Sequence, residues 1–304
     1  MNPALKRQID RWYPLKDHPV QLALINDRKR FPVVPAGRRS GKTERFKRFV
    51  AKEAMKNSSE LYFIAAPTRD QVKKIYWDDM KAFCLTYALP KKPSESDLKI
   101  FMPNGTEIHL IGLDKPARIE GTPWTGGGID EIADIKPHAW EAHILPALNT
   151  VNPTRPDYRA WCWLLGVPDG LNHYYDMAEY AKNSGDSEWG YYHWKSAEIL
   201  PKDVIDSAKR QMSERQFNQE FNASFETAGG RIYEDYGDDN LTDEEILPHE
   251  QLWWHHDQNY TPLSSGVAVK RGNSIFILDE IILHSAVSRQ SAEEFVDKFA
   301  DHKN

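Results

Sequence analysis

The segment AGRRSGKT, residues 36–43, decides the fold of this chain. It follows FPVVPA (31–36), an apolar run typical of a short buried strand, and it precedes a segment with helical periodicity over 41–56. A strand, a glycine-containing loop and a helix in this order form the P-loop pattern, G-x-x-x-x-G-K-[ST]. Ala36 stands at the first glycine position, whereas Gly41, Lys42 and Thr43 match the pattern.

Each matching residue has a chemical role in holding a nucleotide. Gly41 lets backbone N–H groups close on phosphate oxygens, Lys42 places a charge on the β- and γ-phosphates, and Thr43 offers a hydroxyl to Mg²⁺. The amino end of the following helix attracts the anion. The alternative is a basic turn that happens to contain glycine. The predicted nucleotide-binding segment comprises Ala36, Gly37, Arg39, Ser40, Gly41, Lys42 and Thr43.

An acidic pair, Asp130-Glu131, follows a run of three glycines about 90 residues after the loop. In P-loop enzymes an acid at a strand end holds Mg²⁺ through water, and a neighbouring carboxylate can orient the attacking water. We assign the first role to Asp130 and the second, catalytic, role to Glu131. The alternative is a solvated acidic pair at the end of a strand.

Strand-like and helix-like segments alternate through the first two-thirds of the chain. Strand-like runs at 61–67, 99–113, 126–133 and 158–168 alternate with helical patterns at 69–88 and 138–148. Asn104-Gly105 predicts a turn inside the second run. Segment 158–168 is apolar almost throughout, as in a central parallel strand. The pattern predicts an α/β fold, a mostly parallel sheet with helices on both faces.

The bulk composition sets limits on partners. With 40% hydrophobic and 28% charged residues the chain can form a sizeable core. Its net charge of −6 means that any contact with DNA must come from a local patch. No apolar run approaches the roughly 20 residues that span a bilayer. We therefore expect a soluble, intracellular protein with no membrane partner.

The chain changes character near residue 228. Segment 214–225 has the pattern of a last charged helix, and 228–245 is rich in glycine and acid, as in a linker. A hairpin with its turn at 271–273 is predicted over 264–284, followed by a helix from 288. We expect a first domain over 1–227, a linker over 228–245, and an incomplete second domain over 246–304, because two strands and one helix are too few for an independent domain.

In order and content, these motifs resemble the large terminase subunits of tailed bacteriophages. AGRRSGKT resembles their variant Walker A motif, which carries an arginine inside the loop, and 128–148 resembles their Walker B motif and the helix after it. Segment 65–81 resembles the region after their second strand, and 163–176 resembles their coupling motif, although Val167 replaces the frequent threonine. Segment 215–233 resembles their interdomain hinge. The resemblance covers residues 18–290.

The resemblance implies an ASCE-type P-loop ATPase, with a lid and hinge region over about 170–227. Gln21 would be the adenine reader, and Arg38 or Arg39 would be the arginine of the loop. Arg118 lies where such motors can carry an arginine finger, which stabilises charge on the transferring phosphoryl group of a neighbouring subunit. The alternative for Arg118 is an ordinary surface arginine.

Segment 254–269 resembles the first strand of the terminase nuclease, an RNase H-like fold. Asp257 matches its first acid for Mg²⁺ or Mn²⁺, and Glu280 is a possible further contributor. Two-metal cleavage needs several carboxylates around the ions. The other acids of the family lie beyond the part that this chain matches, so we expect no endonuclease activity from these 304 residues.

The function implied by the resemblance is viral DNA packaging: hydrolysis of ATP with Mg²⁺ to move double-stranded DNA into a procapsid. The implied partners are DNA, a small terminase subunit, the portal protein and further copies of the chain in a ring, in the host cytoplasm. Two alternatives remain open. One is a helicase-like nucleic-acid translocase, and the other is a catalytically silent prophage remnant that only binds a partner.

Overall fold

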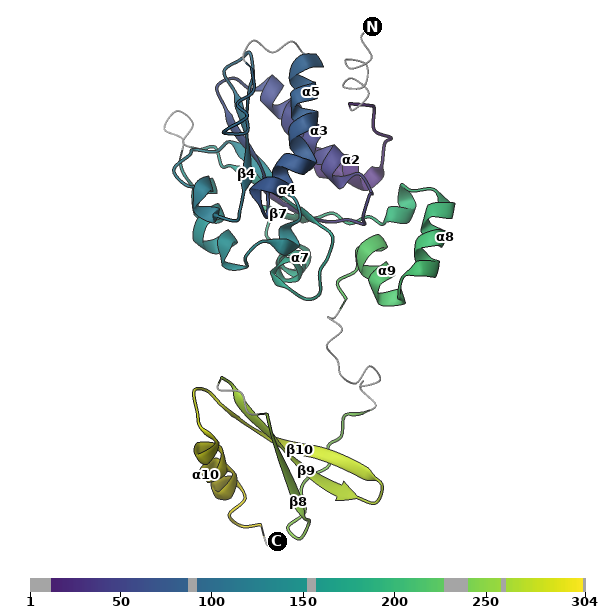
Figure 1. The fold of residues 1–304 in the computed structure, drawn as a ribbon, viewed down its shortest axis with the longest axis vertical. Helices are drawn as coiled ribbons and strands as arrows, with labels where there is room; N and C mark the ends of the chain where they lie inside the picture. Colours follow the sequence, from purple (N-terminus) through teal and green to yellow (C-terminus); the bar gives the residue numbers. More distant parts are fainter. Residues whose placement is uncertain (1–11, 87–91, 152–156, 227–239, 258–260, 303–304) are drawn as a thin grey trace. The chain divides into compact units, whose positions relative to one another are not determined.

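The computed structural model of the chain describes residues 12–86, 92–151, 157–226, 240–257 and 261–302 (Figure 1). It divides into two compact units, Met1–Gly230 and Arg231–Asn304. The division falls inside the segment expected to be a linker, 228–245, most of which lies outside the described residues.

The first unit contains a seven-stranded sheet of order β3-β4-β2-β5-β6-β1-β7. Neighbouring strands run parallel except β3 and β4, which form the antiparallel pair predicted around Asn104-Gly105. The mostly parallel α/β sheet is therefore confirmed, and β6, from the long apolar run, lies in its interior. The strands are β1 (Phe31–Pro35), β2 (Leu61–Ala66), β3 (Lys99–Phe101), β4 (Glu107–Gly112), β5 (Gly126–Ile129), β6 (Trp161–Gly166) and β7 (Trp189–Tyr191).

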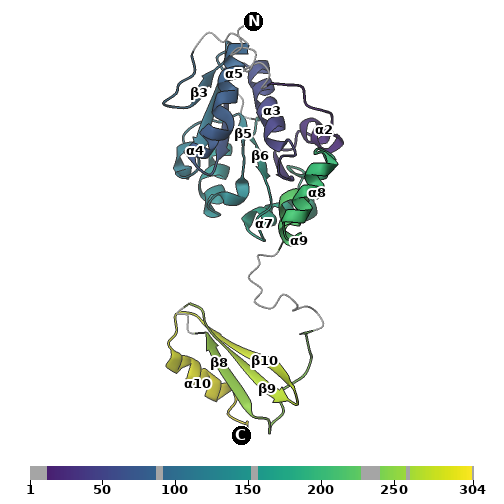
Figure 2. The same cartoon turned by 45° about the vertical axis from the view of Figure 1, so that its right-hand side comes forward.

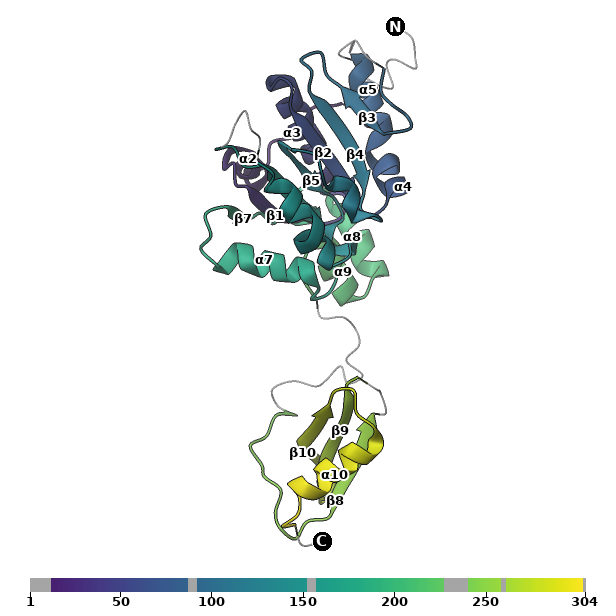
Figure 3. The ribbon, with the colours of Figure 1, turned by 90° about the vertical axis from the view of Figure 1, so that its left-hand side faces the viewer.

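The inner strands are apolar on both sides because helices cover both faces of the sheet. In β2, Tyr62 and Ile64 belong to one buried cluster, whereas Phe63 and Ala65 belong to another, and β6 shows the same alternation. The first cluster includes side chains of α3 (Lys42–Lys56) and α5 (Asp78–Thr86), and the second includes side chains of α7 (His173–Asn183). Figures 1 and 2 show α3 and α5 together, and Figure 3 shows α7 beside β1 and β7.

Two of the predicted helices contain a π-helical turn. The helix predicted over 69–88 is a run of α4, the π turn η1 and α5, and the helix predicted over 138–148 contains the π turn η4. Such turns are frequent at functional sites. None of the described helices is long and apolar enough to cross a membrane. The remaining helical segments are α2 (Pro19–Asn26), α4 (Arg69–Val72), η1 (Lys73–Trp77), η2 (Pro116–Ile119), η3 (Ile132–Asp134), η4 (Trp140–Ile144), α6 (Leu145–Leu148), η5 (Ser196–Glu198), α8 (Lys202–Gln211) and α9 (Glu214–Phe221).

The three glycines of β5 make room for aromatic side chains. A Cβ atom on Gly127 would lie 2.4 Å from the ring of Phe63, and one on Gly128 would lie 2.6 Å from the ring of Phe46. Such distances are far below van der Waals contact, so the rings pack directly on the backbone of β5. This close packing fixes the strand that directly precedes Asp130.

The second unit is a three-stranded antiparallel sheet, order β10-β9-β8, with one helix. The predicted hairpin is confirmed as β9 (Leu263–Arg271) and β10 (Ser274–Leu283), and β8 (Leu252–Asp257) pairs with β9. The predicted helix is α10 (Ser288–Lys298), which packs through Phe295 on Trp254 with ring centroids 4.5 Å apart. The other sheet face carries exposed apolar side chains, among them Ile275 and Ile277.

Candidate nucleotide-binding site

The phosphate loop joins the carboxyl end of β1 to the amino end of α3, as the sequence predicts. Gly41 caps α3 with φ 86°, in the left-handed region that glycine adopts without strain. Arg39, an exposed residue of the loop, also has a positive φ of 58°. Because α3 is 15 residues long, its amino end provides unpaired N–H groups and a helix dipole for an anion.

The two predicted motifs meet at this loop. Thr43 Oγ1 donates a hydrogen bond to Asp130 Oδ2 over 2.7 Å, and Lys42 Nζ lies 3.7 Å from Glu131 Oε1. Asp130 directly follows β5, which is separated from β1 only by β6. Lys42 and Asp130 are only 6% and 0% exposed, so their charges act through a medium of lower dielectric constant than water.

Asp130 has a further partner that the sequence did not identify. Tyr76, in the π turn η1, donates its hydroxyl hydrogen to Asp130 Oδ2 over 2.6 Å. The backbone N–H of Glu131 donates to Asp130 Oδ1 over 3.0 Å. In the sequence Tyr76 has only the signal of a helical core residue.

Glu131 has an unusual backbone conformation, with φ 53°. Left-handed non-glycine residues cluster at functional sites, where the surrounding structure holds them in place. Burial raises the pKa of the Glu131 carboxyl, and the Lys42 ammonium opposes this rise. A raised pKa makes a carboxylate a stronger base and so favours acceptance of a proton.

Segments far along the chain hold the first half of the loop. The Arg38 backbone N–H donates to Glu220 O over 2.7 Å, and its guanidinium Nη2 donates to Glu220 Oε1 over 3.1 Å. Ser196 Oγ donates to Arg38 O over 2.8 Å. A Cβ on Gly37 would lie 2.3 Å from Ser196 Oγ, so a side chain there would force η5 away. The sequence identified Arg38 and Gly37 but neither Glu220 nor Ser196.

Gln21 lies against the loop and is not an exposed helix residue. It is 3% exposed, its Nε2 donates to Ser40 O over 3.2 Å, and its Oε1 accepts from Arg45 Nε over 3.0 Å. Trp194 Nε1 donates to the same Ser40 carbonyl over 3.1 Å. Gln21 therefore braces the loop in this structure.

The residues present fit a nucleotide with Mg²⁺. The Ser40 hydroxyl is buried and has no hydrogen-bond partner within the described structure, although it lies in the phosphate loop. The described residues form no cluster of three or more metal-ligating side chains. Mg²⁺ does not need one, since it commonly binds through one or two carboxylates together with substrate phosphates and waters. Thr43 and Asp130 are a donor set of this kind.

The segment after β6 contacts η3, which follows the acidic pair, and the helix α9. Asn172 Nδ2 donates to Ala133 O over 3.1 Å, and Gly170 N–H donates to Gln219 Oε1 over 3.5 Å. Val167, where the resembling motif often has threonine, is 8% exposed and offers only methyl groups. The segment thus contacts both η3 and α9.

Arg118 lies apart from this cluster within the first unit, whereas Asp257 and Glu280 belong to the second unit. Arg118, on η2, pairs with Asp114 at 3.1 Å, and no contact within the described structure joins it to the loop. Asp257 is the last residue of β8 in the second unit. Glu280 lies on β10, and the sheet order places β9 between the two strands.

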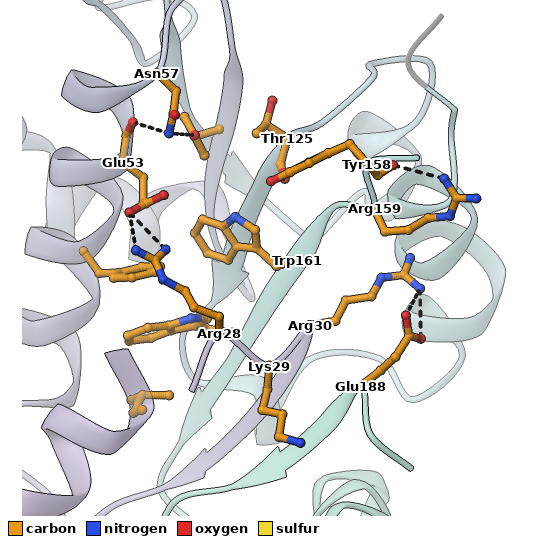
Figure 4. Close-up of a pocket in the computed structure, with 14 residues that line it drawn as sticks. Arg28, Lys29, Arg30, Glu53, Asn57, Thr125, Tyr158, Arg159, Trp161 and Glu188 are labelled. Atoms are coloured by element: carbon orange, nitrogen blue, oxygen red, sulfur yellow. Dashed lines mark hydrogen bonds and ion pairs between the residues drawn. The ribbon is translucent and has the colours of Figure 1, made fainter. Parts of the chain in front are cut away.

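A separate cavity of about 360 Å³ lies at the amino ends of the strands, opposite the loop (Figure 4). Trp161 provides an aromatic wall, and two of the arginines around it form ion pairs. Arg28 contacts Glu53 at 3.1 Å, and Arg30 contacts Glu188 at 3.1 Å. Since the phosphate loop is at the other end of β1, this cavity is not the candidate nucleotide site.

Comparison with known families gives one match. The sequence profile described as terminase large subunit, T4likevirus-type, N-terminal, matches residues 34–141. These residues include the phosphate loop, Tyr76, Arg118 and the acidic pair. A search of curated proteins finds no match.

Several solved structures of large terminases have a fold similar to that of this chain. The ATPase domain of the Thermus phage P74-26 large terminase superposes with a TM-score of 0.56 at 20% identity, covering 69% of this chain and 94% of that chain. The large terminase of a thermophilic bacteriophage gives a TM-score of 0.60 at 16% identity, covering 95% of this chain and 75% of that chain. The large terminase of bacteriophage HK97 gives 0.51 at 11% identity, covering 94% and 66%.

Proposed function

We propose that this chain, which carries the N-terminal motor domain of the large terminase family, hydrolyses ATP to drive double-stranded phage DNA into a procapsid. The proposal is supported mainly by the hydrogen bond of Thr43 to Asp130 and the ion pair of Lys42 with Glu131, within the residues that match the family profile. Structures of a thermophilic phage large terminase of similar fold contain ADP and ATP-γ-S, which supports a nucleotide at this loop.

The chemistry follows from the positions of four side chains. Lys42 binds the β- and γ-phosphates, and Glu131 orients the attacking water and accepts its proton. Mg²⁺, when bound, would be held by the Thr43 hydroxyl and through water by Asp130, and would supply charge neutralisation on the phosphates. Because Lys42 lies 3.7 Å from Glu131, it must turn from this carboxylate to a phosphate when nucleotide binds, which frees Glu131 for the water.

Arg38, Arg118 and Gln21 extend this site. Arg38 is paired with Glu220, so it must leave that carboxylate before it can stabilise charge on the γ-phosphate. Arg118 serves a neighbouring subunit in a ring, since no described contact ties it to its own loop. Gln21 lies next to the loop. Its Nε2 has a second N–H and its Oε1 a second lone pair beyond the bonds to Ser40 and Arg45, and these recognise the adenine edge.

The second unit is proposed to be the start of an RNase H-like nuclease domain that would use Mg²⁺ or Mn²⁺. Asp257 is its first metal-binding acid. Because β9 lies between the strands of Asp257 and Glu280, these two carboxylates are not neighbours across one strand pair. We therefore propose that these residues alone do not form a two-metal site.

The proposed partners are double-stranded DNA, a small terminase subunit, the portal protein and further copies of this chain, in the host cytoplasm. The contact of Glu220 on α9 with Arg38 supports a motor in which the lid responds to the nucleotide. A helicase-like translocase and a silent remnant are the alternative functions.

The test measures ATP turnover and DNA movement together. The wild-type chain is expected to hydrolyse ATP, to do so faster with double-stranded DNA, and to displace a third strand from a triplex while leaving a forked duplex unseparated. Lys42→Ala is the control without turnover. Unwinding of the fork would favour the helicase-like alternative, and absence of turnover under all conditions would favour the silent remnant.

A further inference from the structure

Tyr76 is a fully buried tyrosine whose hydroxyl donates a hydrogen bond to the buried carboxylate of Asp130 in the candidate nucleotide site. Its side chain and that of Asp130 are both 0% exposed, and the two oxygens are 2.6 Å apart. A buried hydroxyl without a partner is costly, so core tyrosines donate to whatever acceptor is near. Tyr174, equally buried, donates to a backbone carbonyl, Leu164 O, at 3.4 Å. Tyr76 instead donates to the acid assigned to Mg²⁺.

The acceptor sites of Asp130 explain what this contact does. Oδ2 accepts from both Thr43 Oγ1 and Tyr76, and Oδ1 accepts from the Glu131 N–H. An ionised carboxylate has about four lone-pair sites. The donors named here use both sites on Oδ2, which leaves one site on Oδ1 for a metal-bound water. Without Tyr76, Oδ2 would keep a single donor, and the carboxylate could turn about its χ2 bond.

We propose that Tyr76 is a positioning residue that fixes the Asp130 carboxylate in the orientation in which it receives hydrated Mg²⁺. The inference rests on the proposed function and extends it to a residue outside the two motifs. Two further observations support it. The ring of Tyr76 packs edge-on against Phe46 of α3, at 6.4 Å between centroids, which holds the hydroxyl over the site. The π turn η1 also departs from α-helical geometry at this residue.

Tyr76→Phe is the appropriate variant because it removes the hydroxyl and keeps the ring in the core. Tyr62→Phe is the matched control, since Tyr62 is also buried (1% exposed) and its hydroxyl accepts a hydrogen bond from Asn57, away from the loop. The readout is binding of a fluorescent ATP-γ-S analogue, measured in EDTA and then across a Mg²⁺ titration. It does not depend on turnover.

For Tyr76→Phe we expect the Mg²⁺ concentration at half-saturation to rise about tenfold, from the loss of one hydrogen bond to a charged group. Binding in EDTA should stay within about twofold of wild type, and Tyr62→Phe should behave as wild type. An unchanged Mg²⁺ dependence in Tyr76→Phe overturns the inference. So does an equal loss of binding with and without Mg²⁺, since that would be an effect on the loop itself.

A double variant keeps the test decisive if Tyr76→Phe weakens the fold. Asp130→Asn should raise the Mg²⁺ requirement by itself, and adding Tyr76→Phe should raise it no further if Tyr76 acts through Asp130. Additive effects would contradict the inference. If the wild-type chain binds the analogue with no Mg²⁺ dependence, both the proposed function and this inference are contradicted. If wild-type binding depends on Mg²⁺ and Tyr76→Phe shows the same dependence, the inference alone is contradicted.

Discussion

The hydroxyl of Thr43 and the carboxylate of Asp130 are 2.7 Å apart although 87 positions separate them in the chain. Thr43 lies in the first turn of α3 and Asp130 follows β5, so the contact joins the carboxyl ends of two strands across β6. A parallel sheet collects its strand ends at one edge, and ligands bind there in open α/β folds. The contact therefore identifies the place where nucleotide chemistry is expected.

Lys42→Ala is expected to weaken ATP binding about 10-fold to 100-fold, because it removes a charged hydrogen-bond donor from the phosphates. Fluorescence anisotropy of a labelled ATP measures the effect. Lys52→Ala removes an exposed lysine from the same helix and should leave the affinity unchanged. Equal affinities for Lys42→Ala and wild type would exclude Lys42 from the site.

Gln21→Ala is expected to weaken ATP about tenfold more than it weakens GTP, because the amide's donor and acceptor match N7 and the N6 amine of adenine, whereas guanine presents two acceptors, N7 and O6, on that edge. Competition binding of the two nucleotides measures this ratio. Gln211→Ala, on the exposed part of α8, is the control. Equal losses for both nucleotides would mean that Gln21 acts only by bracing Ser40.

Arg118 is tested by mixing inactive chains. Arg118→Ala and Lys42→Ala chains are each expected to turn over ATP at least about tenfold more slowly than wild type. A mixture should recover activity, because Arg118→Ala subunits keep a working phosphate loop and Lys42→Ala subunits keep a donor arginine. Steady-state ATP turnover is the measurement. If wild-type rings form under the same conditions and the mixture stays inactive, Arg118 does not act in trans.

Residues 1–304 are expected not to nick plasmid DNA in Mg²⁺ or Mn²⁺, because Asp257 has no second carboxylate on the neighbouring strand β9. Two like-charged ions need shared negative ligands to lie close together. Gel analysis of supercoiled plasmid measures nicking. Metal-dependent nicking that disappears in Asp257→Ala would show that this unit forms a complete site.

The sequence predicted the parts of the site that have a local pattern. The phosphate loop has a local sequence pattern because a strand, Gly41 and a helix must follow one another directly. The acidic pair has a local sequence pattern because Asp130 must directly follow a strand. The parallel sheet was also predicted from local patterns, because its apolar runs are bounded by turn residues, and the structure confirms it.

The partners of these residues come from distant segments and have no local pattern. Tyr76 is 54 positions from Asp130 and has the spacing of an ordinary core residue. Glu220 is 182 positions from Arg38, on α9, whose sequence ERQFNQEF contains several other polar residues. Only the packing of η1 and α9 brings them to the loop. The π turn has no local pattern either, so the sequence predicted one continuous helix over 69–88.

ATP binding and turnover by Glu131→Gln test the catalytic role of Glu131 most directly. The substitution keeps the size of the side chain but removes the carboxylate that orients and deprotonates the attacking water. We expect ATP affinity within about threefold of wild type and turnover lower by about 10² to 10⁴, with the exposed Glu141→Gln as a control of normal activity. Turnover by Glu131→Gln at the wild-type rate would contradict the assignment of Glu131 as the residue that orients and deprotonates the attacking water.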